Sequence, residues 1–180
     1  MDLKYLETGE DIPNDINVVI EIPAQSNPVK YEMNKKASVL VVNRFLTTSM
    51  HYPCDYGFIP HTLAEDGDPL DVMIITPFPL SYGVVIPSRP IGLLNMTDEA
   101  GPDTKILAVP IDRLSPLYRH VQKPEDLGTD LLAGIAHFFQ HYKDLEAGRW
   151  SKVGNWEGVE PAKAEILASI KRYQQKGIER

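Results

Sequence analysis

Residues 17–45 read NVVIEIPAQSNPVKYEMNKKASVLVVNRF, and in this stretch short β-branched runs alternate with turn residues. The runs at 17–22, 29–33 and 39–45 predict three strands, separated by turns that contain Pro, Asn and Lys. In the second run Lys30 and Glu32 alternate with apolar residues, so the two-residue period of a strand places both charges on one face of the sheet. The stretch therefore predicts strands that present opposite charges on a shared wall.

Further short apolar runs predict more strands, at 71–76, 84–86, 91–96 and 106–109, with prolines punctuating them. Many short strands in sequence are typical of a small barrel. We therefore expect a mainly β fold.

The pattern changes after Pro124, where apolar residues from Leu131 to Leu145 recur at spacings of three and four. This periodicity predicts a helix that stops near Gly148. A second helix is expected to begin at Pro161, because proline suits the first helical position, and to stop near Gly177. We expect both helices to pack outside the barrel.

Composition limits the classes of protein that the chain can belong to. A length of 180 residues, with 43% hydrophobic and 24% charged residues, predicts a single globular domain over 1–180. The net charge of -7 disfavours a chain that holds nucleic acid by its phosphates. Cys54 is the only cysteine of the sequence, and the first residues lack the apolar stretch of a secretion signal. No apolar run approaches the roughly 18 residues of a membrane span. We expect a cytoplasmic protein without a membrane segment.

The most informative segment is EDGDPLDV at 65–72, which places Asp66, Asp68 and Asp71 within six residues before a strand. Two carboxylates about 4 Å apart repel by roughly 4 kcal/mol at an effective dielectric of about 20, so their convergence indicates bound cations. All-oxygen ligation selects hard cations, with Mg²⁺ the cellular default and Mn²⁺ as a substitute. An EF-hand is excluded because its loop needs an oxygen ligand and then glycine where this chain has Leu70 and Asp71.

A second acidic turn, TDEAGPDTK at 97–105, lies between two predicted strands. Alone it would be a surface loop. Loops at one end of a barrel can meet, so we interpret Asp98, Asp103 and the first cluster as one multi-metal site, which Glu21 and Glu32 could extend.

These segments resemble the family I soluble inorganic pyrophosphatases of bacteria. The resemblance is carried by DGDPLDV at 66–72, VIEIP at 19–23, KYE at 30–32, YPCDYGFIP at 52–60, MTDEAG at 96–101 and HFFQHYKDLE at 137–146. It implies hydrolysis of pyrophosphate to two orthophosphates on a five-stranded oligonucleotide-binding-type barrel that carries no nucleic acid, in a homo-oligomer that is usually a hexamer.

The resemblance also implies roles for individual residues. Its metal ligands are Asp66, Asp71, Asp98, Asp103 and Glu21, and its substrate-binding residues are Lys30, Arg44, Tyr56, Tyr142 and Lys143, with Lys105 and Glu32 supporting them. One departure is Asp55, where the family more often has asparagine beside Tyr56.

The mechanism expected from these residues is direct attack by a metal-activated water. Asp68 lies between two expected ligands and is placed to accept the proton of that water, while the Lys, Arg and Tyr side chains clamp the phosphates. No Ser, Cys or His arrangement suggests a covalent intermediate.

Other interpretations stay open for some residues and for the function. Tyr142 lies on the apolar stripe of its helix and could be part of the core. His137 and His141 could bind zinc, but no third ligand is evident, so we favour a contact between subunits for this pair. The rival functions are a metal-dependent phosphatase or nuclease, and a barrel that binds divalent cations or oligonucleotides.

Overall fold

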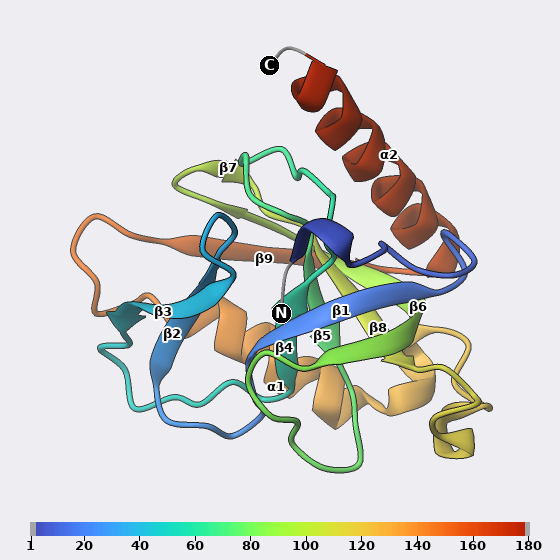
Figure 1. The fold of residues 1–180 in the computed structure, drawn as a ribbon. Helices are drawn as coiled ribbons and strands as arrows, with labels where there is room; N and C mark the ends of the chain where they lie inside the picture. The colour runs from blue at the N-terminus through green and yellow to red at the C-terminus, as the bar shows by residue number, and fades with distance from the viewer. Residues whose placement is uncertain (1–2, 179–180) are drawn as a thin grey trace.

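The computed structural model describes residues 3–178 as strands with two α-helices (Figure 1). The strands are β1 (Ile16–Ile22), β2 (Val29–Asn34), β3 (Val39–Phe45), β4 (Asp55–Phe58), β5 (Asp71–Ile74), β6 (Val85–Asp98), β7 (Gly101–Pro102), β8 (Lys105–Pro110) and β9 (Ser151–Glu157). The helices are α1 (Thr129–His141) and α2 (Val159–Ile178), and the 3₁₀ turns are η1 (Leu3–Tyr5), η2 (Pro116–Tyr118) and η3 (Pro124–Leu127). The mainly β architecture with two helices confirms the predicted class.

The main sheet has seven strands, in which β1, β4, β5, β8 and β6 pair in that order and β6 pairs again with β1. The pairings therefore return to the strand where they began. All are antiparallel except β5 with β8, which run parallel with Val72 opposite Ile106. This parallel pair sets the beginnings of two strands side by side.

The long strand β6 replaces the two strands predicted at 84–86 and 91–96. Its first part pairs with β1 and its last part with β9, while an irregularity between Pro90 and Gly92 shifts its register against β8. Proline cannot donate a backbone hydrogen bond but is tolerated at such irregularities, so the prolines that suggested a break lie inside a continuous strand.

Apolar side chains cover both faces of the central strands. Along β8, Ile106 and Ala108 join one buried cluster, and Leu107 and Val109 join another. The first cluster includes Ala162 and Ile166 of α2, and the second includes Leu132, Ile135, Phe138 and Phe139 of α1. Because successive strand residues point to opposite faces, each helix covers a different face of the sheet.

The β2–β3 hairpin forms a separate two-stranded sheet, which stands to one side of the main sheet in Figure 1. Lys30 and Arg44 lie opposite each other in its register. Lys30 Nζ lies 2.9 Å from Glu32 Oε1, as expected for charges on one face of a strand. The hairpin therefore presents two cations together.

The first helix ends earlier than predicted, at His141 and not near Gly148. Past this point the chain continues in tight turns, with hydrogen bonds from Asp144 N to His141 O and from Glu146 N to Lys143 O. The second helix agrees with the prediction at its start, with Pro161 in the first turn. No helix within residues 3–178 has the length and apolar character to cross a bilayer.

Strands β4 and β9 were not expected from the sequence. In β4, Gly57 weakens the strand signal, yet the structure requires it because an added Cβ would lie 1.9 Å from the carbonyl oxygen of Val19 on β1. The close approach of β1 and β4 therefore depends on a glycine.

We predict that Gly57→Ala destabilises the protein by about 3 kcal/mol or more, because the backbone of β1 would have to move away from β4. Gly134→Ala is the matched control: this position lies in α1, nothing lies within 4 Å of the added Cβ, and helix propensity favours alanine by about 1 kcal/mol. Urea unfolding of both variants measures the difference. Equal stabilities for the two variants would contradict the close packing of β1 and β4.

Candidate active site

A small cavity of about 90 Å³ lies between β1, the hairpin and the loop at 66–71. The carboxylates that line it are Glu21, Glu32, Asp66, Asp68 and Asp71, and the cations are Lys30 and Lys35. Acidic residues from three separate segments thus meet in one place, whereas Asp98 and Asp103 of the second acidic turn do not line this cavity.

The loop at 66–71 is held by its own hydrogen bonds. Asp68 N donates to Asp66 Oδ1 at 3.0 Å, and Ala64 N donates to the carbonyl oxygen of Asp68 at 2.7 Å. Gly67 has a φ of +93°, a conformation that favours glycine. The turn directs Asp66 and Asp68 toward the cavity, and the chain enters β5 at Asp71.

Lys105 lies at the centre of the acidic residues. Its Nζ donates to Asp71 Oδ2, Asp103 Oδ1 and the Tyr56 hydroxyl, each at 2.9 Å, and the residue is 2% exposed. The Tyr56 hydroxyl also donates to Asp71. The parallel register of β5 and β8 explains this contact, since Asp71 and Lys105 begin neighbouring strands.

Electrostatics explain the charge state of this lysine. Burial favours the neutral form, but Asp103 and Asp71 outweigh it and hold the pKa of Lys105 well above its usual value. A buried ammonium group therefore neutralises part of the negative charge of two carboxylates.

The remaining acids of the cavity are less well neutralised. Burial, with a further contribution from the Asp71 charge, raises the pKa of Glu21 to about 8, although Met33 N donates to Glu21 Oε1 at 2.6 Å. Burial also raises the pKa of Asp66, and Asp103, Asp71 and Asp68 add to the shift. Five carboxylates and two lysines line the cavity, so its acidic groups outnumber the cations that could balance them.

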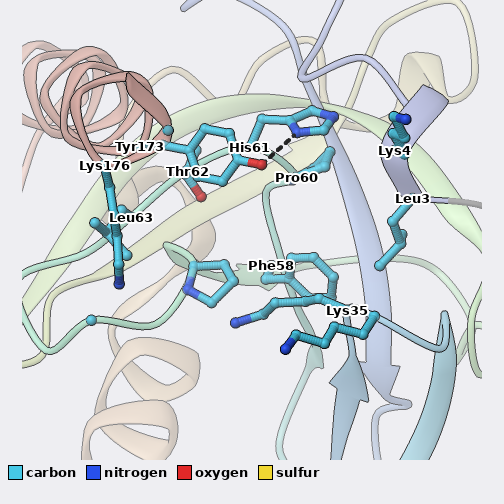
Figure 2. A pocket seen from close by; sticks show the side chains of 14 residues that line it. Leu3, Lys4, Lys35, Phe58, Pro60, His61, Thr62, Leu63, Tyr173 and Lys176 are labelled. Carbon is cyan, nitrogen blue, oxygen red and sulfur yellow. Dashed lines mark hydrogen bonds between the residues drawn. The ribbon is translucent and has the colours of Figure 1, made fainter. Parts of the chain in front are cut away.

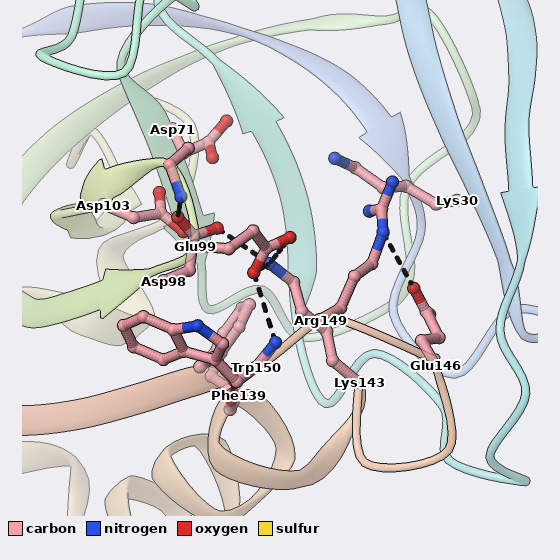
Figure 3. A network of polar contacts seen from close by, with 12 residues as sticks. Lys30, Asp71, Asp98, Glu99, Asp103, Phe139, Lys143, Glu146, Arg149 and Trp150 are labelled. Atoms are coloured by element: carbon pink, nitrogen blue, oxygen red, sulfur yellow. Dashed lines mark hydrogen bonds and ion pairs between the residues drawn. The ribbon is translucent and has the colours of Figure 1, made fainter.

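Two acids of the second acidic turn, Asp98 and Glu99, bind Lys143 (Figure 3). Lys143 Nζ lies 2.7 Å from Asp98 Oδ2 and 3.3 Å from Glu99 Oε2. Burial by itself would raise the pKa of Asp98, but the contact with Lys143 outweighs burial and lowers that pKa. Glu99 also accepts a hydrogen bond from Trp150 N at 3.3 Å. The turn thereby fixes the segment that follows α1.

Arg44 extends from the hairpin to the same segment. Its Nε lies 3.0 Å from Glu146 Oε2, and its guanidinium carbon lies 6.0 Å from the centre of the Tyr142 ring. Among residues 3–178, the buried Arg44 Nη2 has no hydrogen-bond partner. One donor of this group is therefore uncommitted. Tyr142 itself is buried and stacks on Phe138, so its ring belongs to the core, and Lys143 Nζ lies 5.6 Å from its centre.

The donor set can be compared with what a metal ion needs. Within residues 3–178, no three Asp, Glu, His or Cys side chains are arranged to hold an ion together. The chemistry of the donors nevertheless fits a hard cation, because the cavity is lined by carboxylate oxygens and its acids are insufficiently neutralised. To hold an ion, the carboxylates would have to shift toward it. Asp71 and Asp103 would then contact both the ion and Lys105.

Asp55 and the pair His137 and His141 lie outside the lining of this cavity. Asp55 is fully buried away from the cavity lining and accepts hydrogen bonds from Ala24 N, Leu80 N and Thr76 Oγ1, so it ties two loops to β4. The His137 and His141 rings have their centres 4.6 Å apart with planes tilted by 46°, and His141 Nδ1 lies 2.8 Å from Asp144 Oδ2.

Sequence analysis did not assign a role to Glu146, and it treated Glu99 only as part of an acidic turn. Both prove to anchor cations of the site, Arg44 and Lys143. For Glu99 the available signal was its place beside Asp98. Glu146 pairs with a residue 102 positions away, and local sequence carries no signal for such a contact.

The comparisons with known proteins show the family of the chain. Residues 18–174 match the family model for inorganic pyrophosphatase. The inorganic pyrophosphatase of Escherichia coli K12 is 55% identical to this chain, and the match covers 98% of this chain and 100% of the relative. The chain belongs to the inorganic pyrophosphatase family. This confirms the resemblance seen in the sequence.

Solved structures of the family have the same fold as this chain. An inorganic pyrophosphatase from Coxiella burnetii matches with a TM-score of 0.90 and 50% identity, covering 93% of this chain and 99% of its own. The inorganic pyrophosphatase of Thermus thermophilus matches with a TM-score of 0.90 and 40% identity, covering 97% of this chain and 99% of its own. The family fold therefore extends over nearly the whole chain.

We predict that Lys105→Met lowers the free energy of unfolding by about 3–5 kcal/mol in metal-free buffer, because two carboxylates lose their buried partner. Chemical denaturation measures the loss, and Lys171→Met, an exposed lysine on α2, is the control that should change little. Added Mg²⁺ should restore part of the loss if a cation can replace the ammonium. A variant as stable as the native chain would show that the Lys105 contacts do not stabilise the fold.

Proposed function

We propose that this chain hydrolyses inorganic pyrophosphate to two orthophosphates by direct attack of water. As a member of the inorganic pyrophosphatase family that matches relatives over its full length, it is an inorganic diphosphatase. The observation that carries the mechanism is the position of the insufficiently neutralised acidic cavity directly beside the cations of the hairpin. One wall attracts metal ions and the other attracts an anion.

The metal ions are proposed to be Mg²⁺, with Mn²⁺ as a substitute. The residues that would hold them are Asp66, Asp71, Asp98, Asp103 and Glu21. When bound, such ions neutralise the charge of pyrophosphate and lower the pKa of water. Support comes from the lining of the cavity, where five carboxylates face two lysines, so that a cation would relieve repulsion such as that between Glu21 and Asp71.

Asp68 is the proposed general base. Its side chain is 76% exposed and lines the cavity between Asp66 and Asp71, so water can reach it. The only cation near it among residues 3–178 is Lys35, at 3.5 Å. A carboxylate with so few partners can accept a proton without breaking a structural contact.

The phosphate groups are proposed to bind Lys30, Arg44, Tyr56, Tyr142 and Lys143. Arg44 offers its uncommitted Nη2, and Lys30 lies opposite it in the hairpin. Lys143 and Tyr56 now contact Asp98 and Asp71, so their contribution to phosphate binding requires an exchange of partners. Such donors stabilise the negative charge of the leaving phosphate.

Three further properties are proposed on the basis of the family. The returning strand pairings would form the five-stranded closed barrel of the oligonucleotide-binding type, here without nucleic acid. The chain would assemble into a homo-oligomer, the hexamer usual in the family, with His137 and His141 at a contact between subunits. A mass by light scattering above the 20.2 kDa of one chain would support this assembly. The single free Cys54 is consistent with a cytoplasmic location.

The function is tested by phosphate release from pyrophosphate, ATP and an aryl phosphate, each with Mg²⁺ and then with excess EDTA. Pyrophosphate should be hydrolysed far faster than ATP or the aryl phosphate, and EDTA should abolish the reaction. Preference for the aryl phosphate would indicate a general phosphatase, and hydrolysis in EDTA would exclude the metal requirement.

Asp68→Asn separates proton transfer from metal binding, because it keeps the shape of the side chain and removes a basic oxygen. Turnover should fall by about a hundredfold to ten-thousandfold, while the Mg²⁺ concentration for half-maximal activity changes little. Steady-state kinetics across a Mg²⁺ series measure both quantities.

Glu65→Gln is the matched control, since Glu65 is an exposed acid of the same loop that does not line the cavity. It removes the same charge and should leave turnover nearly unchanged. If Asp68→Asn raises the Mg²⁺ requirement in proportion to the loss of activity, Asp68 is a metal ligand and not the base.

A further inference from the structure

A second and larger cavity lies outside the proposed active site (Figure 2). Its volume is about 440 Å³, within the range of small-molecule sites. It is formed by η1, the turn between β2 and β3, the segment at 58–63 and the end of α2. In Figure 2, Lys176 and Leu63 lie on one side and Leu3 and Lys35 on the other, with the Tyr173 and His61 rings above. We call it the lysine pocket.

The charged residues that line the lysine pocket are all basic: Lys4, Lys35, Lys36 and Lys176, together with His61. Not one carboxylate lines it among residues 3–178, although the chain has a net charge of -7. Within the same residues, Lys36 and Lys176 have no carboxylate within 4.0 Å. Lys36 and Lys176 therefore bring positive charge to the pocket without a carboxylate beside them, which favours an anionic ligand.

The rest of the wall is apolar. Leu3, Phe58, Pro60, Leu63 and Pro69 contribute to it, and the Tyr173 ring borders it. Inorganic phosphate would use the cations and leave this surface unfilled. A ligand that combines an anionic group with an apolar or aromatic body would use both.

One residue of the lysine pocket has an unusual backbone. His61 has a φ of +57°, which non-glycine residues seldom adopt. Its ring lies 5.5 Å from that of Tyr173, and its Nδ1 lies 3.3 Å from the tyrosine hydroxyl. This contact joins the end of α2 to the segment at 58–63. Conformations of this kind are often retained at ligand sites.

The lysine pocket shares a wall with the proposed active site. Lys35, Phe58 and Pro69 line both cavities, and Gly67 and Pro69 belong to the acidic loop. The Lys35 ammonium lies 3.5 Å from Asp68 Oδ1. An anion in the lysine pocket would therefore compete with Asp68 for this lysine.

We propose that the lysine pocket binds a small organic phosphate, with its phosphate among Lys35, Lys36 and Lys176 and its apolar body against Leu63 and Pro69. The ligand approaches from the side of α2 and does not enter the acidic cavity. Binding draws Lys35 from Asp68 and so changes turnover. This change in turnover rests on the proposed function, whereas the binding does not.

Isothermal titration calorimetry with a nucleoside monophosphate tests the binding, in EDTA so that the acidic cavity is not neutralised by metal. The full chain should bind the nucleotide, and inorganic phosphate and the uncharged nucleoside should bind more weakly. The double variant Lys36→Met and Lys176→Met should weaken binding by about tenfold per lysine. Lys171→Met, on the same helix but outside the pocket, is the matched control and should bind normally.

Absence of binding to the native chain, or equal binding by the double variant, would overturn the site. Inorganic phosphate binding as tightly as the nucleotide would overturn the assignment to an organic phosphate. Pyrophosphate turnover with Mg²⁺ should then change with nucleotide in the native chain and not in the double variant. Binding without any change in turnover would overturn the coupling, while a chain inactive toward pyrophosphate would refute the proposed function and leave the calorimetric result standing.

Discussion

The structure of the site depends on one buried ammonium group. Lys105, at the start of β8, contacts Asp71 at the start of the parallel strand β5, Tyr56 of the neighbouring strand β4, and Asp103 in the turn before β8. Carboxylates that converge in this way would repel strongly without a cation between them. The lysine thus allows β5 and β8 to begin side by side, and it orients the acidic side chains at that end of the sheet.

The acids beyond the reach of Lys105 have a different role. Burial, with smaller contributions from neighbouring carboxylates, raises the pKa values of Glu21 and Asp66. A protein that only needed stability would replace such acids with apolar residues. Their place in one cavity with Lys30 of the hairpin supports the proposed site for cations and an anion.

Long-range ion pairs hold the cationic side of the site in place. Glu146 binds Arg44 of the hairpin, and Asp98 with Glu99 binds Lys143 after α1. The hairpin and the segment after α1 are joined to the acidic end of the main sheet in this way. The same hairpin turn carries Lys35 and Lys36 to the lysine pocket, so two cavities of opposite charge meet at Lys35.

The sequence by itself determined the class of fold, most of the strands, both helices and the family, because periodicity and the spacing of DGDPLDV are local properties. Tertiary structure decided what depends on contacts between distant segments. It merged two predicted strands into β6, formed β4 around a glycine that must approach β1, and ended α1 at His141. It also placed Lys105 at the centre of the acids and paired Glu146 with Arg44 across 102 residues. Ion pairs and close backbone contacts of this kind arise only when the chain is folded, so no local pattern predicts them.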